Sequence, residues 1–174
     1  MFKSKLGGVA LCVLLAATLA ACAKPQPAKP AVDTAKVAED VKADLHQLVA
    51  DFNSHDAGKA VGHDAADYVG MFHGLPNVKG PAEDLALTKQ QVADPLSKVS
   101  VSDETVDVAS AGDMAVYRAT YAYDFTDPKT KAPATEHGNW VVGYKRQADG
   151  SLKVAWGVVT DTSAPTAAPA VPPK

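Results

Sequence analysis

The hydrophobic pattern of this chain changes its period once, near Pro95, and that change limits the fold to a mixed class. Up to Asp94, most apolar residues recur every three or four positions, as they do on one face of a helix. From Ser97 to Asp161, apolar and polar residues alternate, as they do in half-buried strands. Helices followed by a run of strands predict an α+β domain in which the helices pack on one face of a sheet.

Local signals set the expected helices and strands. Asp33 or Thr34 can cap a first helix, Asp56 can cap a short second one, and Pro81 sits at a favoured first helical position. The expected helices cover residues 34–53, 57–63 and 81–94. Asp149-Gly150 is a strong hairpin signal. The expected strands cover residues 68–72, 97–108, 114–125, 137–147 and 152–161, and the later ones should form an antiparallel meander.

The N-terminus has the layout of a secretory signal. Lys3 and Lys5 precede an apolar run from Leu6 to Leu19, and small residues follow it. The end of this run, Leu19-Ala20-Ala21-Cys22, resembles the lipobox of bacterial lipoproteins. The resemblance implies that the leader is removed before Cys22, which then carries a diacylglycerol on its sulfur and an acyl chain on its new amine. The alternative is an ordinary secretory signal that ends near a cysteine.

A lipid anchor determines where the protein is expected. The apolar run is shorter than the roughly 20 residues that span a bilayer, whereas two or three acyl chains hold a protein firmly. Cys12 lies in the leader, so the mature chain would contain no disulfide. Ala23 follows Cys22 in place of Asp, which resembles the enterobacterial pattern for outer-membrane sorting. The expected location is the bacterial cell envelope, on the periplasmic face of the outer membrane.

Composition divides the chain into four expected parts. Prolines are concentrated near both ends of the mature chain, in segments that favour extended conformations and do not pack. The parts are a leader (1–21), a lipidated Cys with a Pro-rich spacer (22–32), one folded domain (33–163) and an Ala/Pro-rich tail (164–174). The full chain has a formal net charge of −3, and loss of the leader lysines makes it more acidic. Nucleic acid is therefore not an expected partner.

Three stretches of sequence resemble the nuclear transport factor two-like superfamily, which includes SnoaL-like and ketosteroid isomerase-like domains. They are Gly138–Trp156 with its central Asp149-Gly150 turn, Gly112–Val116 before a long strand, and Gly80–Glu83 at a helix start. The resemblance implies a cystatin-like, cone-shaped, curved antiparallel sheet wrapped around the N-terminal helices. It also implies a ligand pocket inside the cone and a homodimer through the outer face of the sheet.

Aromatic and polar residues near this implied pocket are the candidates for ligand binding. Strand alternation means that they cannot all point inward. The candidates are Tyr68, Phe72, Arg118, Tyr121, Asn139, Trp140 and Trp156. The alternative role of the two tryptophans is packing in the core, and that of Arg118 is a solvent-exposed pair with a residue on the neighbouring strand.

Three residues are weak candidates for catalysis. Asp67 begins the first expected strand, although a turn or capping role is commoner there. His73 follows Phe72 where the strand could border the pocket mouth. Asp124 lies on the same strand face as Arg118. If that face is interior, the two residues are a candidate polar pair in the pocket, and if it faces outward, they are solvent-exposed side chains that interact across strands.

No metal or cofactor is expected. Four histidines lie close together in the sequence, but their spacing gives no helical i, i+4 pair and no short zinc signature. They are His46, His55, His63 and His73. The chain also lacks a Gly-x-Ser-x-Gly elbow and a phosphate-binding glycine loop.

Three functions remain open from the sequence. The first is an envelope lipoprotein whose cone binds a small apolar ligand or a partner protein. The second is an isomerase, dehydratase or cyclase that uses an Asp or His in the cone, and the third is a structural homodimer with a filled cone. A buried, unpaired Asp or His in a cavity would favour the enzyme, and a purely apolar cavity would favour binding.

Overall fold

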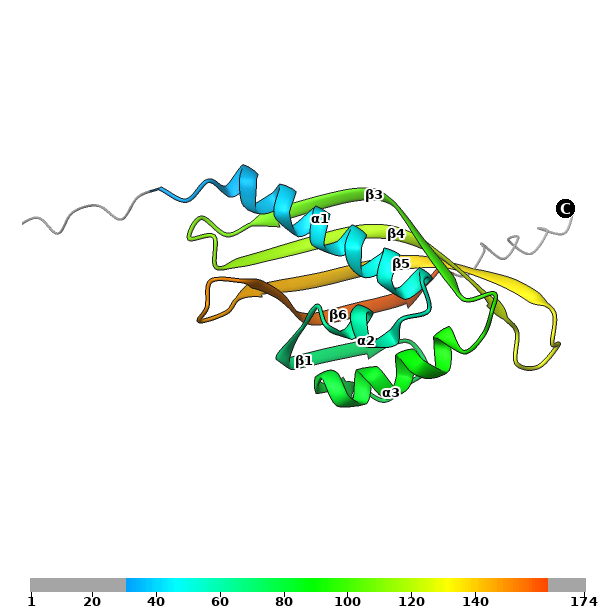
Figure 1. Ribbon diagram of the computed structural model, residues 1–174. Coiled ribbons are helices and arrows are strands. Elements are labelled where there is room, and N and C mark those ends of the chain that lie inside the picture. Colours follow the sequence, from blue (N-terminus) through cyan, green and yellow to red (C-terminus); the bar gives the residue numbers. More distant parts are fainter. Residues whose placement is uncertain (1–30, 163–174) are drawn as a thin grey trace, which may run out of the picture. The chain divides into compact units, whose positions relative to one another are not determined.

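The computed structural model describes residues 31–162, in which one curved six-stranded sheet carries three helices on one face (Figure 1). The elements are α1 (Thr34–Asn53), α2 (Ala57–Val61), β1 (Asp64–Phe72), β2 (Val78–Lys79), α3 (Gly80–Val92), β3 (Lys98–Val108), β4 (Met114–Thr126), β5 (Pro133–Arg146) and β6 (Leu152–Asp161). This confirms the predicted α+β class. The expected leader, spacer and tail lie outside the described residues, as does Cys22.

The helices begin where the sequence signals place them. The Asp33 carboxylate accepts a hydrogen bond from the backbone N–H of Lys36 and caps α1. Asp56 caps α2 in the same way through Lys59. Gly80 has a φ of +73°, a left-handed value that glycine adopts without strain, and it leads the chain directly into α3.

The strand order is β2-β1-β6-β5-β4-β3, and the last four strands in the sequence form the predicted antiparallel meander. The chain crosses from β1 to the far edge of the sheet through α3 and returns by three hairpins, so β6 arrives beside β1. Their pairing is parallel, with Val69 opposite Trp156 and Phe72 opposite Val159. The sheet is therefore mixed, and β2 adds a short antiparallel edge strand that the sequence pattern did not indicate.

Three register irregularities accompany the curvature of the sheet, the first of them in β1 against β6, between Asp64 and Val69. The register of β3 against β4 shifts between Ser102 and Thr105, where Asp103 has a φ of 53°. The register of β5 against β6 shifts between Gly143 and Tyr144. Bulges of this kind bend a strand and increase its twist, which is how a sheet leaves space beneath its concave face.

The core lies between α1 and the inner face of the sheet. Val41 and Leu45 of α1 are fully buried, as are Tyr117 of β4 and Tyr144 of β5. These residues belong to one hydrophobic cluster that includes Tyr68 of β1. The cavity described below borders the C-terminal part of α1, beyond these core residues.

No helix within residues 31–162 is long and apolar enough to span a bilayer.

Candidate functional site

A cavity of about 190 Å³ lies between the inner face of the sheet and the helices. Leu48, Val49 and Phe52 of α1 form part of its wall. Much of the remaining surface is aromatic and comes from strands of the sheet. These aromatic residues are Tyr68, Phe72, Tyr121, Tyr123 and Trp140. The cavity therefore offers a flat or cyclic ligand a mainly apolar surface.

Gly157 in β6 keeps part of this cavity open. A Cβ atom at this position would lie 3.5 Å from the Tyr68 hydroxyl and 3.7 Å from Trp140 Nε1. Both are ordinary contact distances, so the missing side chain leaves open space without forcing the backbone into an unusual conformation. A side chain larger than a methyl group at residue 157 would therefore meet both Tyr68 and Trp140.

Two carboxyl groups line the cavity from different elements. Asp64 is the first residue of β1, and Asp84 lies in the first half of α3. Asp84 is 9% exposed, a degree of burial that aspartate rarely reaches without a partner. Burial raises the pKa of Asp84, and burial together with the charge of Asp84 raises the pKa of Asp64. Because two adjacent carboxylates repel each other, the pair retains a proton at neutral pH.

One oxygen of this pair has no partner. Asp64 Oδ2 is buried and makes no hydrogen bond within residues 31–162. A buried polar atom without a partner costs free energy and marks a place where a ligand group could bind. His63 and Lys153 act on Asp64 electrostatically, and both lower its pKa. Neither of these two residues lines the cavity.

A third acid, Glu136 of β5, lines another part of the cavity. The Tyr121 hydroxyl donates a hydrogen bond to Glu136 Oε1, and His73 Nε2 lies 3.1 Å from the same oxygen. Burial, followed by the hydrogen bond to Glu136, raises the pKa of Tyr121. Glu136 therefore has partners within the protein, unlike Asp64 Oδ2.

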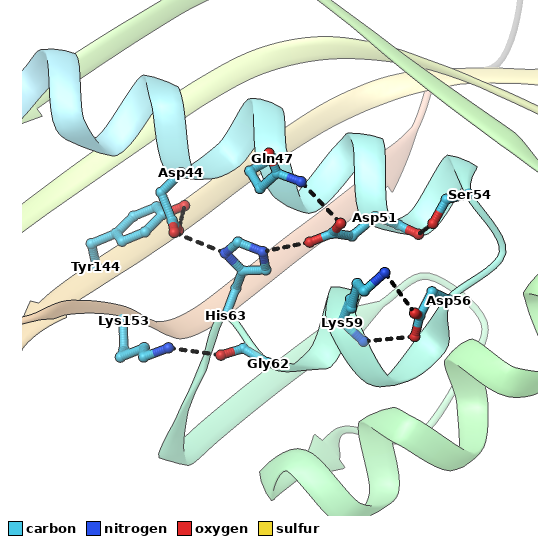
Figure 2. A network of polar contacts seen from close by, with 10 residues as sticks. All are labelled: Asp44, Gln47, Asp51, Ser54, Asp56, Lys59, Gly62, His63, Tyr144 and Lys153. Carbon is cyan, nitrogen blue, oxygen red and sulfur yellow. Dashed lines mark hydrogen bonds and ion pairs between the residues drawn. The ribbon is translucent and has the colours of Figure 1, made fainter.

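His63 forms a separate polar network with residues of α1 and β5 (Figure 2). Its ring lies between Asp44 and Asp51, with Nδ1 2.8 Å from Asp44 Oδ1 and Nε2 3.2 Å from Asp51 Oδ2. The two aspartates are seven residues apart on α1, so they project from the same side of the helix. The Tyr144 hydroxyl donates to Asp44 Oδ2 at 3.0 Å. This network ties α1 to β5 and to the start of β1.

No group of three or more His, Cys, Asp or Glu residues in the described part of the chain is arranged to hold a metal ion. The four histidines instead contact separate protein groups. His46 contacts Glu104, His55 contacts the Val92 carbonyl, His63 contacts Asp44 and Asp51, and His73 contacts Glu136.

Comparisons with solved structures identify the fold. A nuclear transport factor 2-like superfamily protein from Salmonella enterica serovar Typhimurium superposes with a TM-score of 0.65 at 9% identity, covering 76% of this chain and 96% of that one. A protein from Novosphingobium aromaticivorans, described as nuclear transport factor 2-like with a cystatin-like fold, gives 0.57 at 19% identity, with coverages of 72% and 83%. The fold is nuclear transport factor two-like.

A ketosteroid isomerase-like protein from Erwinia carotovora atroseptica shares this nuclear transport factor two-like fold, with a TM-score of 0.59 at 17% identity and coverages of 71% and 95%. No family model matches the sequence. No curated protein sequence matches it either. At these identities the likeness describes the architecture alone, so function has to be argued from the cavity itself.

Four of the seven pocket candidates line the cavity, namely Tyr68, Phe72, Tyr121 and Trp140. The other three do not, because strand alternation turns them to the opposite face. Arg118 is exposed and pairs with Asp107 at 2.6 Å. Asn139 is exposed beside a shallow depression on that outer face. Trp156 covers Gly143, where a side chain would collide with the indole ring.

None of the three catalytic candidates lies in the cavity wall. Asp67 is exposed and accepts a hydrogen bond from Lys145 Nζ at 3.4 Å. Asp124 is also exposed and accepts one from Thr135 Oγ1 at 2.6 Å. His73 is closest to the site, since it contacts the cavity residue Glu136. Asp124 thus occupies the exposed position of its alternative interpretation, whereas Asp67 lies within strand β1 rather than at the turn or cap that its alternative proposed.

The sequence analysis missed the carboxyl pair, although one local signal was present. In α3, Asp84, Thr88 and Gln91 recur at helical spacing, and all three line the cavity. Such a polar stripe on a helix that packs against a sheet indicates a cavity or a buried site. Asp64 gave no comparable signal, because it lies among several acids and histidines and its orientation depends on the bend at the start of β1.

Proposed function

We propose that this protein is a lipid-anchored component of the bacterial cell envelope whose cavity binds a small, mostly apolar ligand. The observation that carries the ligand-binding proposal is the aromatic cavity with the unpartnered oxygen of Asp64 in its wall. Apolar walls with a few polar groups are typical of small-molecule sites. The sequence Leu19-Ala20-Ala21-Cys22 supports the anchor.

The volume of the cavity indicates the size of the ligand. An engineered apolar cavity of about 150 Å³ in another protein binds benzene. At about 190 Å³, the cavity described here suits a molecule with one ring or two small rings. This open volume argues against the alternative in which the cone is filled and the protein is purely structural.

The outer face of the sheet supports a homodimer as a further part of this proposal. Val69 and Met71 of β1 pair with Trp156 and Val158 of β6, and Val141 of β5 lies opposite Val158. These residues alternate with those that line the cavity, so they share the outer face. All of them are half-buried in the isolated chain. A second copy would cover this apolar area.

Proton transfer is the second candidate function, and Asp64 is the observation that favours it. A carboxyl group whose pKa is raised by burial in a ligand cavity can act as a general acid or base. One protein of similar structure is described as ketosteroid isomerase-like. An isomerase or dehydratase would require a substrate atom close to the Asp64 and Asp84 carboxyl groups.

Calorimetric titration with two neutral probes, indole and 2-phenylethanol, tests whether the cavity binds ligands. Gly157→Val provides the matched variant, because its side chain would fill the space between Tyr68 and Trp140. We expect the wild-type chain to bind at least one probe and the variant to bind it at least about tenfold more weakly, since a branched side chain overfills the site. Unchanged binding by the variant, or no binding by either protein, would contradict the proposal.

Native mass spectrometry of protein recovered from a bacterial periplasm complements this titration. A small molecule that accompanies the folded chain and leaves on denaturation would identify the natural ligand class. A spectrum of protein without a bound molecule would exclude a tightly held resident ligand. It would then favour the form of the proposal in which the domain binds a partner protein.

A further inference from the structure

We infer that the ligand carries a protonated amine, which binds the Asp64–Asp84 pair while its apolar body occupies the aromatic part of the cavity. This inference rests on the proposed ligand-binding function and specifies the chemical class of the ligand. Three independent features of the cavity support it: the sign of its charged residues, the missing partner of Asp64 Oδ2, and the aromatic rings in the same wall.

The charged residues that line the cavity all have the same sign. They are Asp64, Asp84 and Glu136, and no Lys, Arg or His within residues 31–162 lines it. Charges in a partly buried site interact more strongly than they do in water. An anionic ligand such as a carboxylate or phosphate would therefore be repelled, whereas a cation would be attracted.

The carboxyl pair lacks the donors that usually stabilise a buried acid. Asp84 is 9% exposed, and the neighbouring side chain that acts on its pKa is that of Asp64, another acid. Asp64 Oδ2 is buried without a partner in the described part of the chain. An ammonium group has three N–H donors and no acceptor, so it could serve both carboxyl groups at once. Charge-assisted hydrogen bonds of this type are about twice as strong as neutral ones.

The nearest cations are already engaged elsewhere. Lys153 Nζ donates to the Gly62 carbonyl at 2.7 Å, and the His63 ring is held between Asp44 and Asp51. Both residues lower the pKa of Asp64 from a distance, but neither reaches into the cavity. No cationic side chain of the described residues therefore contacts the pair from within the cavity, which leaves that contact to the ligand.

The aromatic walls suit the rest of such a ligand. Tyr68 lies close to the carboxyl pair, since both acids act electrostatically on its hydroxyl. Trp140 and Tyr68 both lie close to Gly157. Aromatic faces attract cations and stack on flat rings. An arylalkylamine with one ring and a short linker fits this combination of volume, rings and acids.

The principal alternative is a neutral ligand whose carbonyl or hydroxyl group bonds to the protonated member of the pair. The same skeleton with three different head groups separates these cases. The probes are 2-phenylethylamine, 2-phenylethanol and phenylacetate, which are cationic, neutral and anionic at pH 7. Their affinities are measured by calorimetry on the mature chain in phosphatidylcholine nanodiscs, with empty discs as the blank.

We expect the amine to bind at least about tenfold more tightly than the alcohol, because a hydrogen bond to a charged group exceeds a neutral one by roughly this factor. Phenylacetate should bind more weakly than either. Asp64→Asn and Asp84→Asn should each reduce the preference for the amine over the alcohol. Asp67→Asn changes an exposed acid on the same strand and should leave that preference unchanged.

The outcomes separate this inference from the proposed function. Binding of the alcohol without any preference for the amine would overturn the inference and leave the ligand-binding function intact. A preference for the amine that persists in both Asn variants would also overturn it, because the pair would then not be the receptor. Binding of the alcohol by the variants shows that the cavity is folded. Failure of all three probes to bind the wild-type chain would contradict both proposals.

Discussion

His63 Nδ1 lies 2.8 Å from Asp44 Oδ1, and the hydroxyl of Tyr144 occupies the other oxygen of the same carboxylate. The His63 side chain is 12% exposed, so this contact is largely shielded from water. Hydrogen bonds to Asp44 and Asp51 raise the pKa of His63 against the opposing effect of burial. The charged form of His63 therefore joins α1 to the first strand of the sheet.

Replacement of this histidine should reduce stability in a pH-dependent way. His63→Gln is expected to lower the free energy of unfolding by about 1 to 3 kcal/mol at pH 5.5, because two carboxylates lose a charged partner. A raised pKa gives stability that is complete below the unfolded pKa of about 6.5 and is lost as the pH rises through the folded value. The difference between wild type and variant should thus shrink towards pH 9. Urea unfolding at several pH values measures it.

His46→Gln is the matched control for this experiment. His46 also contacts a carboxylate, Glu104, but its side chain is 56% exposed. Loss of the His46–Glu104 contact should lower the free energy of unfolding by less than about 1 kcal/mol. Equal losses of stability in His46→Gln and His63→Gln would contradict the special role given to His63.

Asp84→Asn should stabilise the folded protein at alkaline pH. The raised pKa of Asp84 means that the wild-type chain loses stability as the pH rises from the unfolded value of about 3.9 to the folded one. His63 and Lys153 lower the pKa of the neighbouring Asp64 and so moderate the cost of charging the pair. The variant is expected to be more stable than wild type by on the order of 1 kcal/mol at pH 8 and about equal at pH 4. Thermal unfolding at both pH values checks it, and a variant less stable at pH 8 would disprove the assigned burial cost.

Substitution by alanine should affect the stability of the protein differently at two glycine positions. Gly157→Ala adds a methyl group at ordinary contact distance and should leave stability unchanged or raise it by about 0.5 to 1 kcal/mol. Gly143→Ala would force its methyl group into the indole ring of Trp156 and should cost about 1 to 3 kcal/mol. Urea midpoints compare the two variants. Destabilisation by Gly157→Ala alone would mean that the cavity is not open at this point.

Arg118→Ala tests the assignment of the strand faces. The Arg118–Asp107 pair is exposed, so its loss should change the free energy of unfolding by less than about 1 kcal/mol. Because Arg118 lies on the opposite face from the cavity, titration with 2-phenylethanol should give the wild-type affinity. An affinity lowered by more than about threefold, or 0.6 kcal/mol, would place Arg118 in the site after all.

Cys22→Ser tests the lipid anchor. If Leu19-Ala20-Ala21-Cys22 acts as a lipobox, the wild-type protein should partition into the detergent phase and carry the mass of a diacylglycerol and an acyl chain. The variant should lack both the lipid mass and the cleavage before residue 22. Intact-mass measurement of both proteins decides the question. A wild-type chain without lipid would support the ordinary secretory signal instead.

The meander from β3 to β6 was predictable because its determinants are local. Asp149-Gly150 specifies its own turn, and alternating residues on either side specify their own strands. The pairing of Asp64 with Asp84 had no such basis, since it arises only when α3 packs across β1. The same limit explains why alternation alone could not place Arg118 or Trp156. Choosing which of two faces is the inner one requires knowing where the helices lie.

The parallel pairing of β1 with β6 also sets the order in which the domain can assemble. Residues 64–72 depend for their central neighbour on residues 152–161, which are synthesised after all the other strands. Until then β1 has only the two-residue strand β2 beside it, and the remaining strands form a separate half-sheet. A chain cut short before Leu152 would expose two unpaired sheet edges and half of an aromatic cavity, which are the features that proteases and chaperones act on. Completion of the last strand thus distinguishes a finished molecule from a fragment.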